Sequence, residues 1–266
     1  MTIIRACPAL LVVAACGAPA TPSVDALDRA DATGTADAAT GGDPVGTWAA
    51  RRVLRTVAPA PVGGPATTIT ATLTVLTIAA DGDGLAVTDD PCEVRMASSS
   101  ALATPSLVPG YAAGLPTATR AGAITDGALV VPLGLDVVGA ALAQPASDPL
   151  PTTTDAPTVI DADADGQPGL TVRVAVTGLG VEEVYVVQRT EFTLRSTSLA
   201  DDRIGGALEI ARFEQRTIGA SNPLFADSPE ITLDRPGSRF DLVRQAPGYG
   251  CAELVAADEV ALFGPR

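Results

Sequence analysis

The stretch that decides the fold is Thr67–Ile78, which reads TTITATLTVLTI. Every second residue from Thr68 to Thr74 is a threonine. The residues between these threonines are apolar, namely Ile69, Ala71, Leu73 and Val75. An apolar residue at every second position, in a segment rich in β-branched side chains, predicts a β-strand with one apolar face and one hydroxyl face.

Similar extended runs occur along the rest of the chain. Leu170–Thr177 alternates in the same way, Gly178–Gly180 supplies a turn, and Val184–Leu194 is again extended, so this region predicts a β-hairpin. Further strands are expected at Thr47–Val57, Leu85–Met96, Ala128–Leu135, Ile204–Gln215, Arg239–Arg244 and Ala252–Phe263. Val137–Ala143 is the best helical candidate. Roughly nine or ten strands with few helices predict an all-β fold, either an antiparallel β-barrel or a β-sandwich.

The charged residues limit the classes of function. The formal net charge of −14 disfavours nucleic-acid binding, because phosphates and an acidic surface repel each other. All 17 basic residues are arginine, so the chain lacks the His of a Ser-His-Asp triad and the Lys of a Schiff base. A glycosidase with paired carboxylates remains conceivable, but only 3% of the residues are aromatic. We therefore expect no enzyme and no nucleic-acid partner.

The N-terminus has the pattern of an export signal. Met1–Cys16 reads MTIIRACPALLVVAAC, with a positive charge at Arg5, an apolar stretch and small residues before the cysteine. Val13–Cys16 resembles the lipobox of bacterial lipoproteins. This resemblance implies cleavage before Cys16 and attachment of lipid to that cysteine. The alternative is a buried apolar strand that ends in cysteine.

These features predict the organisation of the chain. Residues 1–15 are expected to form a lipoprotein signal peptide, residues 16–43 the lipidated cysteine and a disordered linker rich in small and polar residues, and residues 44–266 a single all-β domain. The protein would then be lipid-anchored in the cell envelope, at the outer membrane or at a membrane facing the periplasm. Its partners would be that membrane and either an envelope protein or a small ligand.

The remaining cysteines suggest a disulfide. Cys7 would leave with the signal peptide and Cys16 would carry lipid, which leaves Cys92 and Cys251. Two cysteines in an oxidising compartment favour one disulfide, here between an early strand and the last strand. Closing so long a loop stabilises a fold by at most about 4 to 5 kcal/mol in the chain-entropy model. The alternative is two separate buried thiols.

The clearest chemical motif is Asp161–Val172, which reads DADADGQPGLTV. Calcium binds six to eight oxygen ligands, and alternating carboxylates followed by a glycine turn supply several of them. The candidate ligands are Asp161, Asp163, Asp165 and the carbonyl of Gln167. Further ligands would come from Asp155, Glu182 or Glu183. The alternative is a solvated acidic turn in which the aspartates cap backbone amides.

The spacing matches the first half of an EF-hand loop, but Val172 stands where a bidentate Glu is required. The segment is more similar to the calcium loops of extracellular modules such as thrombospondin type-3 repeats. This resemblance implies a weak structural calcium site. Asp81–Gly84, with only two acids between apolar runs, predicts a hairpin turn.

Gly46-Thr47-Trp48 resembles the Gly-x-Trp element of lipocalins. The resemblance implies that Trp48 closes the base of an eight-stranded barrel and stacks beneath an arginine from near the C-terminus, for which Arg244 is the candidate. The second lipocalin motif is not visible in the sequence. The alternative is a lone Trp that fills the core of another kind of β domain.

The sequence thus favours a lipid-anchored extracytoplasmic envelope protein with a structural calcium loop and a non-catalytic binding or structural role. A lipocalin-like carrier of a small apolar ligand is the first alternative. A calcium-dependent hydrolase is the second.

Overall fold

The computed structural model describes residues 42–59, 65–227 and 231–266, and the predicted signal peptide, Cys16 and nearly all of the predicted linker lie outside these ranges. The strands are β1 (Gly46–Ala58), β2 (Ala66–Asp81), β3 (Gly84–Ser98), β4 (Ala103–Leu107), β5 (Ala118–Thr125), β6 (Ala128–Val138), β7 (Leu170–Val176), β8 (Gly180–Leu199), β9 (Arg203–Ala220), β10 (Thr232–Leu233) and β11 (Arg239–Gln245). The helices are η1 (Tyr111–Gly114), η2 (Pro223–Phe225), α1 (Cys251–Ala256) and α2 (Glu259–Phe263).

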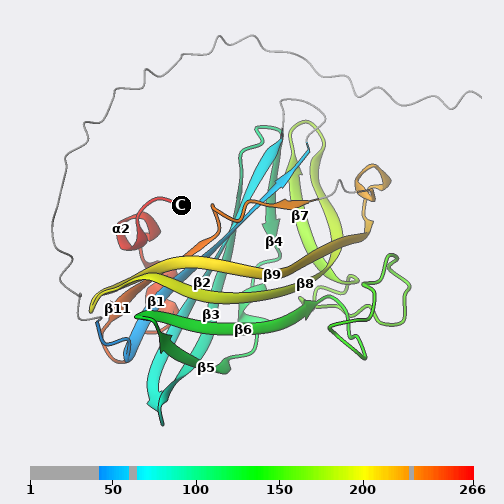
Figure 1. The fold of residues 1–266 in the computed structure, drawn as a ribbon. Coiled ribbons are helices and arrows are strands. Elements are labelled where there is room, and N and C mark those ends of the chain that lie inside the picture. Colours follow the sequence, from blue (N-terminus) through cyan, green and yellow to red (C-terminus); the bar gives the residue numbers. More distant parts are fainter. Residues whose placement is uncertain (1–41, 60–64, 228–230) are drawn as a thin grey trace, which may run out of the picture. The chain divides into compact units, whose positions relative to one another are not determined.

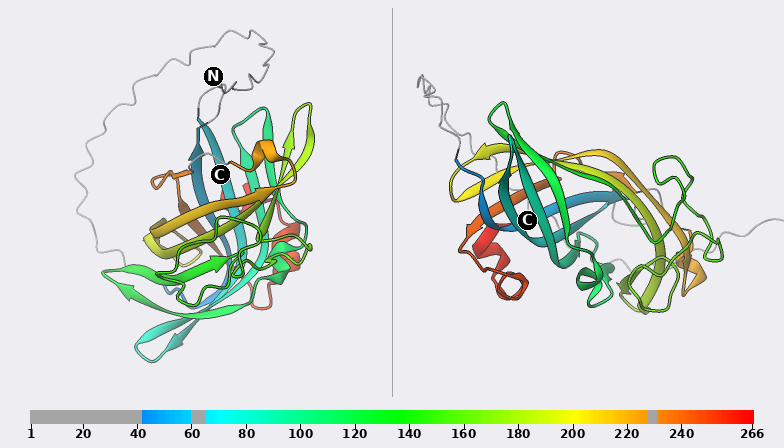
Figure 2. Two further views of the ribbon diagram at one scale, coloured as in Figure 1. Left: turned by 90° about the vertical axis from the view of Figure 1, so that its right-hand side faces the viewer. Right: turned by 90° about the horizontal axis from the view of Figure 1, so that it is seen from below.

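The strands form one antiparallel sheet that closes on itself (Figure 1). Eight strands pair in the order β8-β6-β5-β3-β2-β1-β11-β9, and β9 pairs again with β8 to complete a ring. Two views at right angles show the strands curving round to this closure (Figure 2). Strands β7 and β4 extend the sheet from β8, and β10 pairs with β1. The predicted all-β antiparallel fold is confirmed. Closure of the ring pairs the strand edges that an open sheet would leave exposed.

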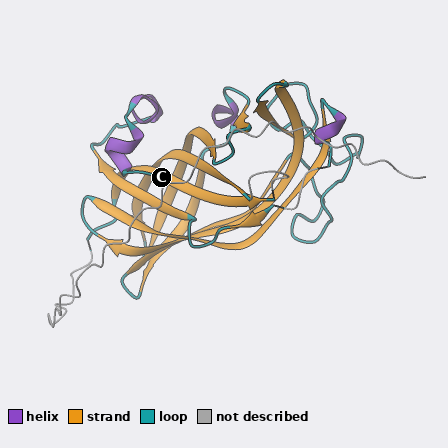
Figure 3. Cartoon of the chain, turned by 90° about the horizontal axis from the view of Figure 1, so that it is seen from above, coloured by secondary structure: helices purple, strands orange, loops and turns teal. Residues whose placement is uncertain are grey.

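Alternation along β1 separates the inside of the ring from its outer face. Trp48 and Ala50 belong to the main apolar core, whereas Ala49 packs in a second cluster with Leu254 and Phe263 of the two α-helices. These helices lie outside the strands (Figure 3). The residues of β2 that pair with inward residues of β1 also point inward, since paired residues share a face.

The threonine-rich strand β2 therefore turns its hydroxyl face into the ring. Thr74 pairs with inward-facing Ala50 and is fully buried. Leu73 and Val75, on the apolar face, pack outside against the α-helices. Along Thr68–Thr74 of β2, the inside of the ring is thus lined by hydroxyl groups and its outer face is apolar.

Two sequence-based assignments are wrong. Ala252–Phe263 forms helices α1 and α2 instead of a strand. Glu253 accepts a hydrogen bond from the Gly250 N–H, and Asp258 accepts from the N–H groups of Val260 and Ala261, so each helix begins at a capped end.

The second wrong assignment is the helix expected at Val137–Ala143. Strand β6 continues to Val138, and Gly139 then adopts a φ of 81°, where a Cβ would lie 2.8 Å from the Val186 carbonyl oxygen. Glycine relieves this contact and the positive φ together. Strands β4 and β5 lie at residues to which the sequence analysis assigned no strand.

The C-terminal segment 251–266, here called the clasp, is fastened to the outer face of the ring. Cys92 of β3 and Cys251 form the predicted disulfide, with a Cα–Cα distance of 5.1 Å, but Cys251 begins α1 and is not in the last strand. The bond closes a loop of 159 residues and stabilises the fold by about 5 kcal/mol in the chain-entropy model.

An ion-pair network reinforces the clasp. Arg51, only 1% exposed, lies 2.8 Å from Asp241 and 3.4 Å from Glu259, and its Nη1 donates to the Gly264 carbonyl. Arg95 and Arg266 also pair with Glu259. Burial alone would raise the pKa of Glu259, but the hydrogen bonds and charges of these arginines outweigh it and lower the pKa.

Replacing Glu259 by Gln is expected to destabilise the chain by about 3 to 5 kcal/mol at neutral pH, because Arg51 would remain buried with less of its charge compensated. Since the folded-state pKa is lowered, the stabilisation is present above the ordinary value of 4.5 and is lost as the pH falls through the folded value. Urea unfolding of the full chain at neutral and acidic pH measures both effects. The control is Glu209→Gln, whose exposed pair with Arg195 is worth about 0.2 to 1 kcal/mol. Equal losses in the two variants would contradict the prediction.

Candidate metal centre

The loop of residues 161–167 begins and ends at one short bridge beside β7. Asp161 pairs in parallel with Gly169. The Ala162 N–H donates to the Gly169 carbonyl over 2.8 Å, and the Gly169 N–H donates to the Ile160 carbonyl over 2.9 Å. A Cβ on Gly169 would lie 2.7 Å from the Val186 carbonyl oxygen. The absence of a side chain on Gly169 therefore lets the base of the loop pack directly on β8.

Within the loop the aspartates turn toward the backbone. Asp161 accepts hydrogen bonds from the N–H groups of Asp165 and Gly166, and Asp165 accepts from the Gln167 N–H. Asp163 accepts from the N–H of Thr171, the second residue of β7, over 3.0 Å. These bonds fix the positions of all three carboxylates.

The three carboxylates converge. One oxygen from each of Asp161, Asp163 and Asp165 lies within 4.8 Å of the other two. Among the described residues this is the one group of three or more potential ligands that could hold a metal ion. Three negative charges at this distance repel one another unless a cation compensates them. The predicted convergence is confirmed.

The carboxylates titrate differently. A hydrogen bond from the Gly166 N–H is the main cause that lowers the pKa of Asp161. Burial raises the pKa of Asp163, and the neighbouring charge of Asp165 adds to this effect. Half-buried and close to other carboxylates, Asp163 is the group whose charge a cation would stabilise most.

Two buried oxygens in this region have no hydrogen-bond partner among the described residues. They are Oδ1 of Asp163 and Oγ1 of Thr171, and Thr171 is fully buried. Buried oxygens of this kind normally have a protein, water or ion partner. Carboxylate and hydroxyl oxygens are hard donors of the type that calcium prefers, so the residues fit a calcium ion.

The other predicted ligands have different surroundings. The Gln167 N–H bonds to Asp165, and a role for the Gln167 carbonyl stays a prediction. Glu183 lies 3.4 Å from Arg173, and Glu182 accepts from the Ser221 hydroxyl, so both have partners away from the aspartates. Asp155 is likewise not among the clustered carboxylates.

The sequence analysis did not identify Tyr111 as a residue influenced by the aspartate loop. Burial, together with the charges of Asp136 and Asp163, raises its pKa to about 12. It belongs to η1, more than 40 residues from the loop in sequence, and no local pattern connects the two.

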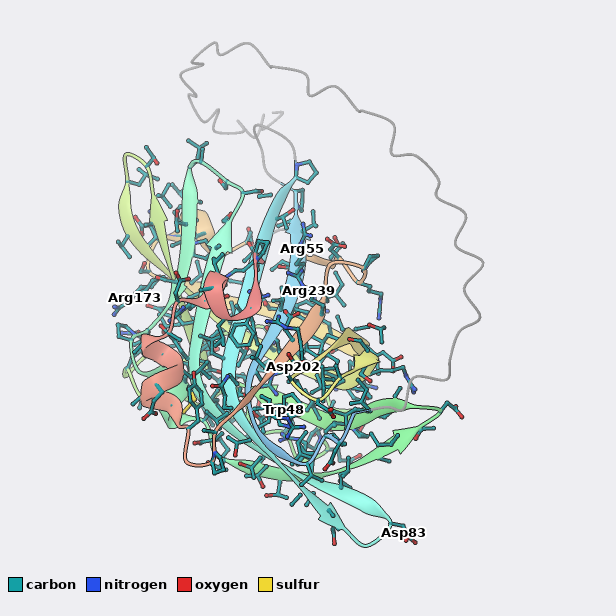
Figure 4. The ribbon with its side chains drawn as sticks, turned by 90° about the vertical axis from the view of Figure 1, so that its left-hand side faces the viewer. Trp48, Arg55, Asp83, Arg173, Asp202 and Arg239 are labelled. Atoms are coloured by element: carbon teal, nitrogen blue, oxygen red, sulfur yellow. A yellow bond between two sulfur atoms is a disulfide. The ribbon has the colours of Figure 1, made fainter. Side chains whose placement is uncertain are left out.

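The second acidic segment forms the expected turn. Asp81 pairs with Gly84 at the end of the β2–β3 hairpin. Asp83 lies at the tip of that hairpin (Figure 4). Both aspartates are exposed, so the prediction of a hairpin turn is confirmed.

Arg244 of β11 stacks on Trp48 of β1. The Arg244 guanidinium lies 4.2 Å from the centre of the Trp48 ring, and the Trp48 Nε1 donates to the Pro44 carbonyl over 2.8 Å. Arg244 also donates to the Val45 carbonyl over 2.7 Å. Gly46, two residues before Trp48, has a φ of 144°, which favours glycine, and a Cβ there would lie 2.5 Å from Arg244 Nη1. The predicted stacking of Arg244 on Trp48 is confirmed.

The chain was compared with known proteins in three ways. No family model matches it, and neither the curated proteins nor the solved structures include a significant match.

The disulfide points to an oxidising compartment outside the cytoplasm. Within residues 42–59, 65–227 and 231–266, no helix combines the length and apolarity needed to cross a lipid bilayer.

The exclusion of catalysis from the lack of His and Lys was wrong. Arginines form ion pairs with carboxylates throughout the described residues, and Arg51 and Arg189 are only 1% and 3% exposed in such pairs. Buried charged pairs of this kind occur in catalytic sites as well as in structural ones. The absence of His and Lys therefore does not exclude catalysis.

In chelator at neutral pH, Asp163→Asn is expected to leave the full chain at least as stable as the original. Because the folded-state pKa of Asp163 is raised, its ionisation opposes folding once the pH exceeds the ordinary value of 3.8. Asn carries no charge, so the variant avoids this loss of stability. Denaturant unfolding at neutral and at acidic pH tests this, and the advantage of the variant should shrink in acid. Asp83→Asn, in the exposed turn, is the control. A large loss of stability for Asp163→Asn in chelator would contradict the prediction.

Proposed function

We propose that this chain is an exported envelope protein, held to a membrane by lipid on Cys16, whose ring of strands is stabilised by calcium at Asp161, Asp163 and Asp165. The observation that carries the calcium site is the convergence of three carboxylate oxygens within 4.8 Å beside the unpartnered Asp163 Oδ1. The disulfide supports a location outside the cytoplasm, where calcium is plentiful enough for a weak site.

Calcium would supply positive charge where the carboxylates repel one another. Asp163 already accepts a hydrogen bond from the N–H of Thr171 in β7, so an ion on Asp163 would tie the loop to that strand. Strand β7 pairs along its whole length with β8, which belongs to the ring. The ion would thus join an irregular loop to the closed sheet, which is a structural role.

The lipid anchor would act through the segment that precedes the described residues. Asp43 donates its N–H to Asp201, and Gly42 donates to the Leu199 carbonyl, so the chain enters the ring beside the β8–β9 turn. A lipidated N-terminus would therefore tether the ring from this end of β1. The envelope partner that the tethered ring would meet is a protein or a small ligand.

Calcium at about ten times its dissociation constant is expected to stabilise the full chain by about 1.4 kcal/mol, which raises the melting temperature by a few degrees. Asp161→Asn should abolish the rise, because it removes one of the three convergent carboxylates. Thermal unfolding in millimolar calcium and in chelator measures the effect. Asp83→Asn, with its charge removed from the β2–β3 turn, should keep the full response. Identical melting curves with calcium and with chelator would refute the site.

The mature protein is expected to begin at Cys16 with a diacylglyceryl group on its sulfur, and Cys16→Ser should release the protein from the membrane fraction. Mass spectrometry of the N-terminal peptide and fractionation of expressing bacteria test the two statements. Cys7→Ser is the matched control, because Cys7 would be removed with the signal peptide. An unmodified N-terminus, or release by the control as well, would contradict the anchor.

A further inference from the structure

A cluster of charged residues lies inside the ring. Arg52 follows Trp48 and Ala50 on the inward face of β1. Asp89 of β3 pairs with Leu76, and Arg120 of β5 pairs with Val87. Leu76 and Val87 both belong to the apolar core inside the ring, and paired residues share a face. Three strands therefore direct charged side chains into the same interior.

The cluster is close and mostly buried. Arg52 Nη1 lies 2.6 Å from Asp89 Oδ2, and Arg120 Nη1 lies 3.8 Å from the same oxygen. Asp89 is 5% exposed. The side chains of Arg52 and Arg120 are 16% and 30% exposed, so the cluster is in contact with solvent on the Arg120 side.

Several polar atoms of this cluster are unused. Asp89 Oδ1, Arg120 Nη1 and Thr74 Oγ1 are buried without a hydrogen-bond partner among the described residues. Thr74 is fully buried on the same inward face, opposite Ala50. An acceptor, a cationic donor and a hydroxyl thus remain available in one place, although buried polar atoms are normally paired.

The charges of the cluster do not balance. Two guanidinium groups face one carboxylate, and neither Arg52 nor Arg120 makes another ion pair among the described residues. By contrast, among the described residues no buried side-chain atom of Arg51, or of Glu259 in the clasp, lacks a partner. An excess positive charge inside a protein favours an anionic group beside it.

The wall beside the cluster is hydroxylated. Thr68, Thr70 and Thr72 share the inward face of β2 with Thr74, and all three are half-buried. A hydroxyl both donates and accepts hydrogen bonds, so this wall suits a ligand that carries hydroxyl groups. An apolar ligand, as the lipocalin resemblance implies, would leave these groups and the charged cluster unpaired.

We propose that the inside of the ring binds a small hydroxycarboxylate. Its carboxylate would accept from Arg120 and offset the excess positive charge, its hydroxyl would donate to Asp89 Oδ1, and the Thr74 hydroxyl would complete the contacts. The proposal is independent of the lipid anchor and of the calcium loop, since none of its residues belongs to either.

Isothermal titration of the full chain with glycerate, in chelator so that calcium does not contribute, tests the site. Glycerate is expected to bind saturably at millimolar concentration. Propionate, which lacks hydroxyls, should bind at least about tenfold more weakly, and glycerol, which lacks the carboxylate, should not bind. Absence of glycerate binding at tens of millimolar, or equal binding of glycerate and propionate, would overturn the proposal.

Variants assign the binding to the cluster. Arg120→Gln should weaken glycerate binding by about tenfold or more, because it removes the charged partner of the carboxylate. Thr74→Val keeps the shape of the side chain and loses only the unpartnered hydroxyl, so it should fold normally and bind glycerate more weakly. Arg195→Gln, at an exposed pair with Glu209, should bind as the original does. Unchanged binding in both Arg120→Gln and Thr74→Val would show that glycerate sits elsewhere and would overturn the site.

Discussion

The pairing of β8 with β9 is the constraint on which the rest of the structure depends. It runs from Val184 opposite Ala220 to Leu199 opposite Ile204 and converts an open sheet into a closed ring. Register shifts interrupt it at three places, including one between Glu191 and Phe192. Bulges of this kind increase the twist and bend of a strand, which helps a sheet to close. Closure then gives every strand of the ring an inside and an outside.

Two adjacent arginines of β1 show how the inside and the outside of the ring give neighbouring residues different partners. Arg51 points outward, and the clasp buries it among carboxylates and the carbonyl groups at the end of α2. Arg52 points inward and meets Asp89. A strand changes face at each residue, so a shift of one residue in the β1 register would exchange these environments. The backbone pairing of β1 with β2 and β11 therefore fixes both the clasp and the interior cluster.

The sequence predicted features that depend on local pattern and, of the contacts between distant segments, the Cys92–Cys251 disulfide and the stacking of Arg244 on Trp48. Alternation in Thr67–Ile78 identified β2, and the spacing of the aspartates identified the loop, because both signals lie within a dozen residues. The C-terminal helices were missed because each is only five or six residues long, too short for a helical period to show. The cluster at Asp89 and the buried Thr171 were missed because their surroundings come from strands far apart in sequence.

Arginine as the only basic residue also shapes the response of the protein to acid. Guanidinium groups keep their charge at any pH at which the chain folds, so charge inside the structure changes mainly at carboxylates. Protonation of Glu259, whose pKa is lowered, removes attraction from the clasp, whereas protonation of Asp163, whose pKa is raised, relieves repulsion in the loop. Acid therefore destabilises the clasp and stabilises the aspartate loop. A proton and a calcium ion are alternative ways to remove the same repulsion at Asp163, and they would compete for that carboxylate.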